Sequence, residues 1–288
     1  MISIVIASVN ENHLADIKTN IAATIGVAYE IIDFENNEGK VGLCELYNRG
    51  ASQAKFSIIC YMHEDIKIST YDWGKTIVNA FDKNENLGII GIAGGVYKAI
   101  SPSGWHSVSE ITERSHIIQQ FKFSDQEDLH HNINPYQEEA ALIACVDGVW
   151  FCTLKEIVKA HPFDDKLFKG FHGYDIDFSL QVGQKYEITV RYDILITHFS
   201  EGNFNLTWVG EILKLHQKWN RSLPISKVSL DKKTQLLIEK RTFKRFIDDA
   251  IANGITKRTL YGALWAKNGI RKINLLLFLQ LNRYLLKK

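Results

Sequence analysis

The chain has 288 residues, 45% of them hydrophobic, and its 34 Lys and Arg against 33 Asp and Glu leave a formal net charge of +1. That length can bury a large core, and it fits one large α/β domain or, as we expect, such a domain followed by a helical appendage. Residues 1–9 show no basic segment and no small-residue cleavage site, which argues against a signal peptide and predicts a cytoplasmic protein.

The first 62 residues predict a β-α-β-α-β unit. Residues 2–7 form a continuous apolar run with the length and β-branched content of a buried parallel strand, and a polar loop follows it. A helix over 17–25, a strand over 29–34, a helix over 43–54 and a strand over 56–62 come next. This alternation predicts a doubly wound sheet, whose ligands bind beyond the carboxyl ends of its strands.

The later part of the chain is less regular. Residues 73–81 predict a helix and 87–91 a strand, but residues 97–140 lack a clear period, and we interpret them as a long functional insertion. A buried strand pattern resumes over 140–151, followed by helices over 153–160 and 175–182 and strands over 188–192 and 194–198. Beyond residue 206 the chain turns helical and basic, which predicts two domains, residues 1–205 and 206–288.

An acidic cluster, His63-Glu64-Asp65, directly follows the strand expected over 56–62. Oxygen ligands suit Mg²⁺ or Mn²⁺, which take only one or two protein carboxylates when phosphate and water complete the shell. One aspartate therefore suffices if the substrate is a diphosphate. From these three residues alone, however, a solvated acidic turn that caps the next helix is the favoured interpretation.

Two carboxylates, Asp175 and Asp177, lie at the start of the helix expected over 175–182. They sit in the field of the first-turn N–H groups and should stay ionised, and the glycine-rich loop before them leaves them accessible. An ionised carboxylate beside a cleft can take a proton from an alcohol, so we interpret one of them as a catalytic base. The alternative is a helix cap, which adds about 1 kcal/mol of stability without chemistry.

Histidines and a tryptophan provide weaker signals. His198 ends an apolar strand, and a neutral imidazole there could complete the shell of a borderline metal such as Mn²⁺, although a lone histidine is more often structural. Four further side chains in the 97–140 segment could stack on or hydrogen-bond a sugar: Trp105, His106, His130 and His131.

In their order and spacing these features resemble the family 2 glycosyltransferases, which have the GT-A fold, over about residues 1–205. The likeness rests on six stretches: residues 4–11, 30–36, 47–51, 63–65, 146–148 and 173–177. The last matches the pattern Gly-Glu-Asp-x-Asp, and 63–65 stands where the family carries its D-x-D. Two positions depart from the family, because His63 replaces the first Asp of the D-x-D and Tyr174 replaces the Glu before the base.

The resemblance implies a role for each matching residue. Residues implied to contact the nucleotide are Ala7, Val9, Glu35, Asn48 and Glu64. Those implied to hold Mn²⁺ or Mg²⁺ are Asp65 and His198, with His63 as a further candidate. Asp175 is implied as the catalytic base with Asp177 as the alternative, and Asp147 and Trp105 as contacts for the donor or acceptor sugar. The implied fold is a GT-A-like doubly wound mixed sheet with flanking helices.

The implied activity is that of a metal-dependent, inverting hexosyltransferase. It would move a sugar from a nucleotide-diphosphate sugar, with a UDP-sugar favoured, to a hydroxyl of a saccharide or lipid-linked acceptor in surface polysaccharide or glycan synthesis. Two alternatives stay open: a non-catalytic binding or scaffold protein of the same fold, and a sugar nucleotidyltransferase. Against the second, no Gly-rich loop with Lys or Arg lies near the first expected strand.

The C-terminal segment is strongly basic and ends in an apolar run. Residues 232–288 contain 14 Lys and Arg against 3 Asp and Glu, a charge of +11, whereas residues 1–231 carry 20 against 30, a charge of −10. The apolar residues 270–286 are too few and too interrupted to span a membrane, but they suit its interface, where each Lys or Arg adds about 1 kcal/mol near anionic lipid. We predict peripheral association with the inner face of a membrane and no nucleic acid partner. The alternative is a helix that packs against the catalytic domain or a second subunit of a homodimer.

Overall fold

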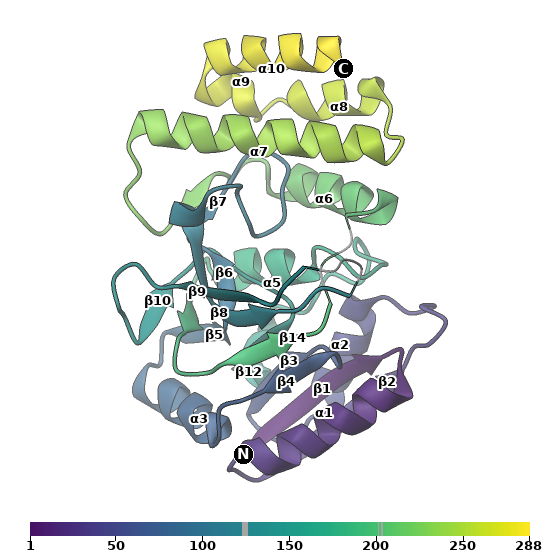
Figure 1. The fold of residues 1–288 in the computed structure, drawn as a ribbon, viewed down its shortest axis with the longest axis vertical. Helices are drawn as coiled ribbons and strands as arrows, with labels where there is room; N and C mark the ends of the chain where they lie inside the picture. The colour runs from purple at the N-terminus through teal and green to yellow at the C-terminus, as the bar shows by residue number, and fades with distance from the viewer. Residues whose placement is uncertain (123–125, 201, 203) are drawn as a thin grey trace.

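The computed structural model describes residues 1–122, 126–200, 202 and 204–288. Its centre is a seven-stranded sheet with the strand order β10-β13-β5-β12-β3-β1-β2 (Figure 1). The strands are β1 (Ile2–Ser8), β2 (Tyr29–Glu35), β3 (Ile58–Met62), β5 (Leu87–Gly91), β10 (Ala140–Leu142), β12 (Trp150–Leu154) and β13 (Glu187–Arg191). β1 is parallel to β2 and β3, and β13 is parallel to β5, but β12 runs antiparallel between β3 and β5. The predicted α/β class with a mixed sheet is confirmed.

Helices cover both faces of this sheet because its strands are apolar on both sides. In β3, Cys60 and Met62 join one hydrophobic cluster, whereas Ile59 and Tyr61 join the other, as the two-residue side-chain period requires. The helices α1 (Glu11–Thr24) and α3 (Trp73–Lys83) pack on the first face. The second face carries α2 (Leu43–Gln53), α4 (Lys155–Ala160) and α5 (Tyr174–Val182).

A second sheet stands beside the carboxyl ends of the central strands. Its order is β11-β6-β8-β14-β4, and β9 pairs with β8 outside this path. The strands are β4 (Ile66–Ile68), β6 (Ala93–Gly95), β8 (Glu113–Gln119), β9 (Leu129–Ile133), β11 (Cys145–Val146) and β14 (Ile196–His198). A short 3-10 helix (Glu110–Thr112) precedes β8, and β7 (Tyr97–Lys98) pairs with β15 (Ile225–Ser226).

Residues 97–140, which we interpreted as a long functional insertion without a clear period, contain the regular strands β8 and β9 of this sheet. Residues 123–125 of this segment lie outside the described part of the chain. The sequence shows no alternation of apolar and polar residues over β8, because polar side chains occupy buried positions of this strand. Glu113, Arg114 and Ser115 are all less than 5% exposed. A strand whose inward positions are polar gives no apolar alternation in the sequence.

The C-terminal region is helical, as predicted. Its helices are α6 (Leu206–Trp219), α7 (Lys232–Ala252), α8 (Lys257–Leu264), α9 (Ile270–Ile273) and α10 (Leu275–Lys287), and they stack at the end of the molecule opposite α1 (Figure 1). One hydrophobic cluster continues from the central sheet through α6, α7, α8 and α10. The buried Glu239 of α7 also accepts hydrogen bonds from the Tyr97 hydroxyl (2.6 Å) and the Ser101 amide (2.9 Å). The change in composition at residue 206 thus falls inside a continuous core.

Candidate functional site

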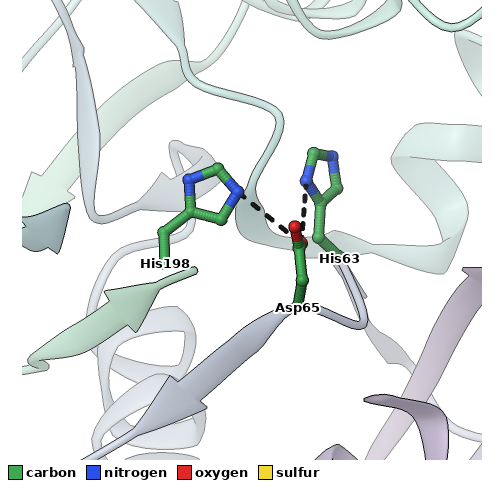
Figure 2. Close-up of side chains that lie close together, drawn as sticks. All are labelled: His63, Asp65 and His198. Atoms are coloured by element: carbon green, nitrogen blue, oxygen red, sulfur yellow. Dashed lines mark ion pairs between the residues drawn. The ribbon is translucent and has the colours of Figure 1, made fainter. Parts of the chain in front are cut away.

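Three side chains from distant parts of the sequence form a cluster with the geometry of a cation site. His63, Asp65 and His198 each offer one ligand atom, and these atoms lie within 4.8 Å of one another. The Asp65 carboxylate lies between the two imidazoles, with Oδ1 3.8 Å from His63 Nδ1 and 3.6 Å from His198 Nε2 (Figure 2). The antiparallel pairing of β4 with β14 sets His198 opposite Ile66 and so brings it beside Asp65. Two imidazoles and a carboxylate suit a borderline divalent ion such as Mn²⁺.

The electrostatics of the cluster also suit a cation. Burial by itself would raise the pKa of Asp65, but the neighbouring imidazoles of His198 and His63 and the hydrogen bond from the Ser200 hydroxyl outweigh it and hold that pKa well below its usual range. Partial burial lowers the pKa of His63. A cation ligand must be deprotonated, so an ionised Asp65 and a neutral His63 are both in the form that binds.

A glutamine that the sequence did not single out orients His198. Gln119 ends β8 and lies opposite His198 in the parallel pairing of β8 with β14. Its side-chain oxygen lies 3.2 Å from His198 Nδ1, and its amide nitrogen donates to the Ser200 carbonyl (2.8 Å). When Nδ1 donates to Gln119, Nε2 faces Asp65 with its lone pair, 3.5 Å from Ser200 Oγ, which is the arrangement that orients a metal-binding histidine.

The first turn of α5 carries the second half of the site. The loop before it passes through Gly173, whose φ of +76° favours glycine, and is held by Glu211 of α6. Glu211 accepts hydrogen bonds from the amides of Gly170 (2.9 Å) and His172 (3.0 Å). Asp175 then projects beside β11, where its Oδ2 accepts a hydrogen bond from the Gly148 amide (3.1 Å). The C-terminal region therefore positions the candidate base.

The expectation that the helix start keeps Asp175 fully ionised is wrong. Burial and the negative charge of Asp147 raise the pKa of Asp175 to about 7, against the opposing hydrogen bonds of backbone amides including that of Gly148. Desolvation and a like charge thus outweigh the helix N-terminus. A carboxyl with this pKa is well matched to proton abstraction near neutral pH.

Asp177 lies in a different environment from Asp175, although only one residue separates them. It is 1% exposed, and its carboxylate is bound by Lys218 Nζ (2.8 Å) and Trp219 Nε1 (2.7 Å) of α6 and by the Gln181 amide (2.8 Å). These contacts tie α5 to α6. Asp177 therefore stabilises the packing of α5 against α6. Asp175, in contrast, lines a cavity.

A cavity of about 1240 Å³ lies in front of Asp175. Several residues predicted from the sequence line it together: His63, Trp105, His106, His130, His131, Asp147 and Asp175. The C-terminal region adds wall residues that the sequence did not indicate, among them Trp208, Arg241 and Arg245. Their only sequence signal was aromatic and basic character in a segment interpreted as an appendage. The cavity is larger than typical small-molecule pockets, which measure roughly 300–1,000 Å³.

The residues expected to contact a nucleotide lie along the carboxyl ends of β1, β2 and β3. Ala7 is the last residue but one of β1, Val9 directly follows the strand, and the exposed Glu35 ends β2 opposite Ser8. Glu64 is 7% exposed and accepts hydrogen bonds from the amides of Val9 (3.0 Å) and Asn10 (3.3 Å). Its carboxylate therefore shapes the loop after β1.

Asn48 of α2 forms hydrogen bonds that stabilise a neighbouring loop. Its amide nitrogen donates to the Phe163 carbonyl (2.9 Å) and to Asp165 (3.3 Å), and its oxygen accepts from the Phe163 amide (3.0 Å). These bonds hold the loop that leads toward α5. A contact between Asn48 and a nucleotide stays a prediction, and it would have to coexist with this role.

Comparison with known proteins gives one family match and several similar solved structures. A family model with the description "Glycosyltransferase like family" matches residues 3–219, and no curated protein matches the chain. Among solved structures, the chain is similar to GalNAc-T7 with UDP, GalNAc and Mn²⁺ (11% identity, TM-score 0.48), over 88% of this chain and only 57% of that one. It is also similar to S. aureus TarS 1-349 (10% identity, TM-score 0.48), over 92% of this chain and 75% of that one. For TarS in complex with UDP the values are 11% identity and a TM-score of 0.47, over 92% and 75%.

Proposed function

This chain belongs to the glycosyltransferase-like family, and we propose that it is an inverting enzyme that transfers a sugar from a nucleotide-diphosphate sugar to an acceptor hydroxyl. The observation that carries the proposal is the position of Asp175. Its carboxyl group, with a pKa raised to about 7, lines the same cavity as His63 of the candidate cation cluster. A base and a charge-stabilising group on one cavity are what group transfer to an alcohol needs.

In the proposed reaction Asp175 accepts the proton of the acceptor hydroxyl. The hydroxyl oxygen forms a bond to the anomeric carbon while the bond from that carbon to the diphosphate breaks, and the electron pair leaves with the diphosphate. Attack from the face opposite the leaving group inverts the anomeric centre. A divalent cation held by Asp65 and His198, with His63, would supply positive charge for the departing diphosphate.

The donor side is proposed to lie at the carboxyl ends of β1 and β2. Val9 is 57% exposed and Glu35 is exposed beside it, so both are open to a base or ribose. We propose a UDP-sugar as the donor and Mn²⁺ or Mg²⁺ as the cation. Trp105 and Asp147 line the cavity and are proposed to contact a sugar, since an aromatic ring and a carboxylate fit its apolar face and its hydroxyls.

A direct test is nucleotide binding followed by a donor screen. Calorimetry with UDP and with GDP, each with and without Mn²⁺, should show metal-dependent binding of UDP. Incubation with a set of UDP-sugars and oligosaccharide acceptors should then release UDP. No metal-dependent binding of either nucleotide would contradict the proposal and favour the scaffold alternative. Release of pyrophosphate from UTP and a sugar 1-phosphate would favour the nucleotidyltransferase.

The outer face of α10 supports a proposal about location. The helix packs on the core through Leu277, Phe278 and Leu281, but it turns Leu276 (64% exposed) and Leu279 (54%) outward. It is the outermost helix at that end of the molecule (Figure 1). None of the described helices is long and apolar enough to cross a membrane. We propose that this face lies in the interface of an anionic membrane and brings the cavity near a lipid-linked acceptor.

Sedimentation with vesicles tests this proposal. The chain should pellet with anionic vesicles at low salt and be released at high salt, and a Leu276→Gln/Leu279→Gln variant should pellet less. Truncation is a poor test, because removing α7 would uncover the core and the Glu239 hydrogen bonds. Equal pelleting of variant and wild type would contradict the proposal. A change from dimer to monomer without any lipid effect would show that a second copy covers this face.

A further inference from the structure

The two positions at which the sequence departs from the glycosyltransferase pattern contact each other. His63 Nε2 lies 3.2 Å from the Tyr174 hydroxyl, although 111 residues separate them in the chain. The Tyr174 hydroxyl in turn donates to the Gly148 carbonyl (3.1 Å). A side chain at Gly148 would prevent this arrangement, since a Cβ there would lie 2.2 Å from the Tyr174 hydroxyl oxygen.

Counting protons assigns the tautomer of His63. A tyrosine hydroxyl has one hydrogen to donate, and the Gly148 carbonyl takes it. The oxygen can then only accept from His63, so Nε2 must carry the N–H. A neutral imidazole has a single N–H, and Nδ1 is therefore left with its lone pair. A tyrosine hydroxyl has an ordinary pKa of about 10, so it keeps this proton near neutral pH.

The lone pair of Nδ1 faces the cation cluster. Nδ1 lies 3.8 Å from Asp65 Oδ1, which is too long for a hydrogen bond but suits two ligands of one ion. The backbone of His63 is held as well, because its amide donates to the Val149 carbonyl (2.9 Å). The ring is thus fixed at its backbone and at its far nitrogen, with the near nitrogen free.

We propose that Tyr174 is a positioning residue that holds His63 as the Nε2–H tautomer, so that Nδ1 completes the cation site with Asp65 and His198. The inference rests on the proposed function, because it concerns the same cation site. It also links that site to the candidate base. Gly148 accepts from Tyr174 through its carbonyl and donates to Asp175 through its amide, so one short network runs from His63 to Asp175.

Metal titration of the full chain tests the inference without relying on turnover. Calorimetry with Mn²⁺ alone should show binding to the wild type, and Tyr174→Phe should weaken it roughly 10- to 100-fold, as loss of an outer-shell partner of a metal-bound histidine does. Tyr61→Phe is the matched control, since this buried hydroxyl belongs to the same aromatic cluster but donates to the Tyr47 carbonyl (3.4 Å). The control should bind Mn²⁺ as the wild type does. If Tyr174→Phe and the wild type bind Mn²⁺ with equal affinity, the inference about Tyr174 is wrong but the cation site stands. If the wild type binds no Mn²⁺, the cation site itself is wrong.

A rescue experiment separates positioning from general structural damage. A carboxylate has no tautomers, so in a His63→Asp background the Tyr174 hydroxyl has no ring to orient. There Tyr174→Phe should change the Mn²⁺ affinity by no more than about twofold, the limit expected of uncoupled sites. A 10- to 100-fold loss in both backgrounds would show that Tyr174 does not act through His63, and would overturn the inference.

The tautomer can also be read in the unmodified protein, which removes any dependence on a variant that folds poorly. In histidine-labelled protein, long-range nitrogen–proton correlations distinguish Nε2–H from Nδ1–H rings, and a His63→Gln sample assigns the signals of His63. We expect the Nε2–H form in the metal-free chain. Observation of the Nδ1–H form would overturn the inference.

Discussion

In the cation cluster the carboxyl group of Asp65 is held ionised, whereas on the cavity wall the pKa of Asp175 is raised to about 7, so that its carboxyl group is partly protonated near neutral pH. Burial acts in the same direction on both, because it raises the pKa of each. The neighbours decide the outcome. Asp65 lies between two imidazoles and accepts a hydrogen bond from Ser200, whereas Asp175 faces the negative charge of Asp147. Similar burial therefore gives one strong cation ligand and one base of moderate strength.

This difference is what the proposed reaction requires of its cation ligand and its base. A ligand for a divalent cation must stay charged throughout, whereas a base must first lack a proton and then hold it. The short network through His63, Tyr174 and Gly148 connects the cation cluster to Asp175. Three substitutions change one side of this comparison, and a fourth, at Asp177, tests whether Asp175 is the correct choice of base.

The largest effect is expected from Asp175→Asn, because an amide cannot accept the acceptor's proton. Turnover should fall by roughly 10²- to 10⁴-fold, the range attributed to a positioned general base. Metal-dependent UDP binding should be unchanged, since Asp175 is not one of the three residues of the cation cluster. The measurements are UDP release and calorimetry with UDP. Turnover near that of the wild type would exclude Asp175 as the base, and the contrast between a cation ligand and a base would then be wrong.

The second-largest effect is expected from Asp65→Asn in the cation cluster. Loss of the one carboxylate of the cluster removes its negative charge, and the transfer rate should fall about 100-fold or more. In contrast to Asp175→Asn, this variant should also lose the dependence of UDP binding on Mn²⁺. Calorimetry with and without Mn²⁺ distinguishes the two variants. Retained metal dependence would show that the cation is bound elsewhere.

Asp177→Asn is expected to affect stability more than chemistry. It weakens a buried carboxylate's bonds to Lys218 and Trp219, and leaving buried partners poorly satisfied costs about 1–3 kcal/mol. Urea unfolding should report this loss in the free energy of unfolding. Turnover at temperatures where the variant is folded should stay within a small factor of the wild type. A large loss of turnover without loss of stability would restore Asp177 as the base.

The smallest and most specific effect is expected from Asp147→Asn, which changes the pH dependence. Burial is the main reason why the pKa of Asp175 lies at about 7, and the charge of Asp147 is the second. Removing that charge should lower the pKa of Asp175, so the acidic limb of the pH–rate profile should move to lower pH. The side-chain oxygen of the introduced asparagine can still accept from the Val149 amide, as Asp147 does now (2.8 Å). An unmoved limb would mean that another group controls it.

Asp175 also predicts a sign for stability against pH. A carboxyl group with a raised pKa in the folded state favours folding while it is protonated, so this contribution is lost as pH rises from its unfolded value of about 4 through its folded value of about 7. The difference in unfolding free energy between Asp175→Asn and the wild type should therefore shift in favour of the variant across that window. Urea unfolding of both proteins at several pH values measures it, and a constant difference would contradict the raised pKa.

Much of the fold was predictable because the strands of the central sheet are apolar on both faces and alternate with amphipathic helices. The helix expected over 43–54 is α2 (Leu43–Gln53), and the strand expected over 29–34 is β2 (Tyr29–Glu35). The prediction of strands failed where buried positions are occupied by polar side chains. β8 is buried but polar, so no periodic signal marks the strand that carries Gln119 to His198.

The amino-acid sequence by itself determined the α/β class, the polar residues at the strand ends and the two acidic clusters, because these follow from local composition and spacing. Only the tertiary structure decided how those residues are used. It paired β4 with β14 and so brought His198 to Asp65, and it set Asp177 against Lys218 and Trp219 while leaving Asp175 beside Asp147. The physical reason is that burial and neighbouring charge depend on residues far apart in the chain, whereas a sequence pattern reports only residues that are close along it.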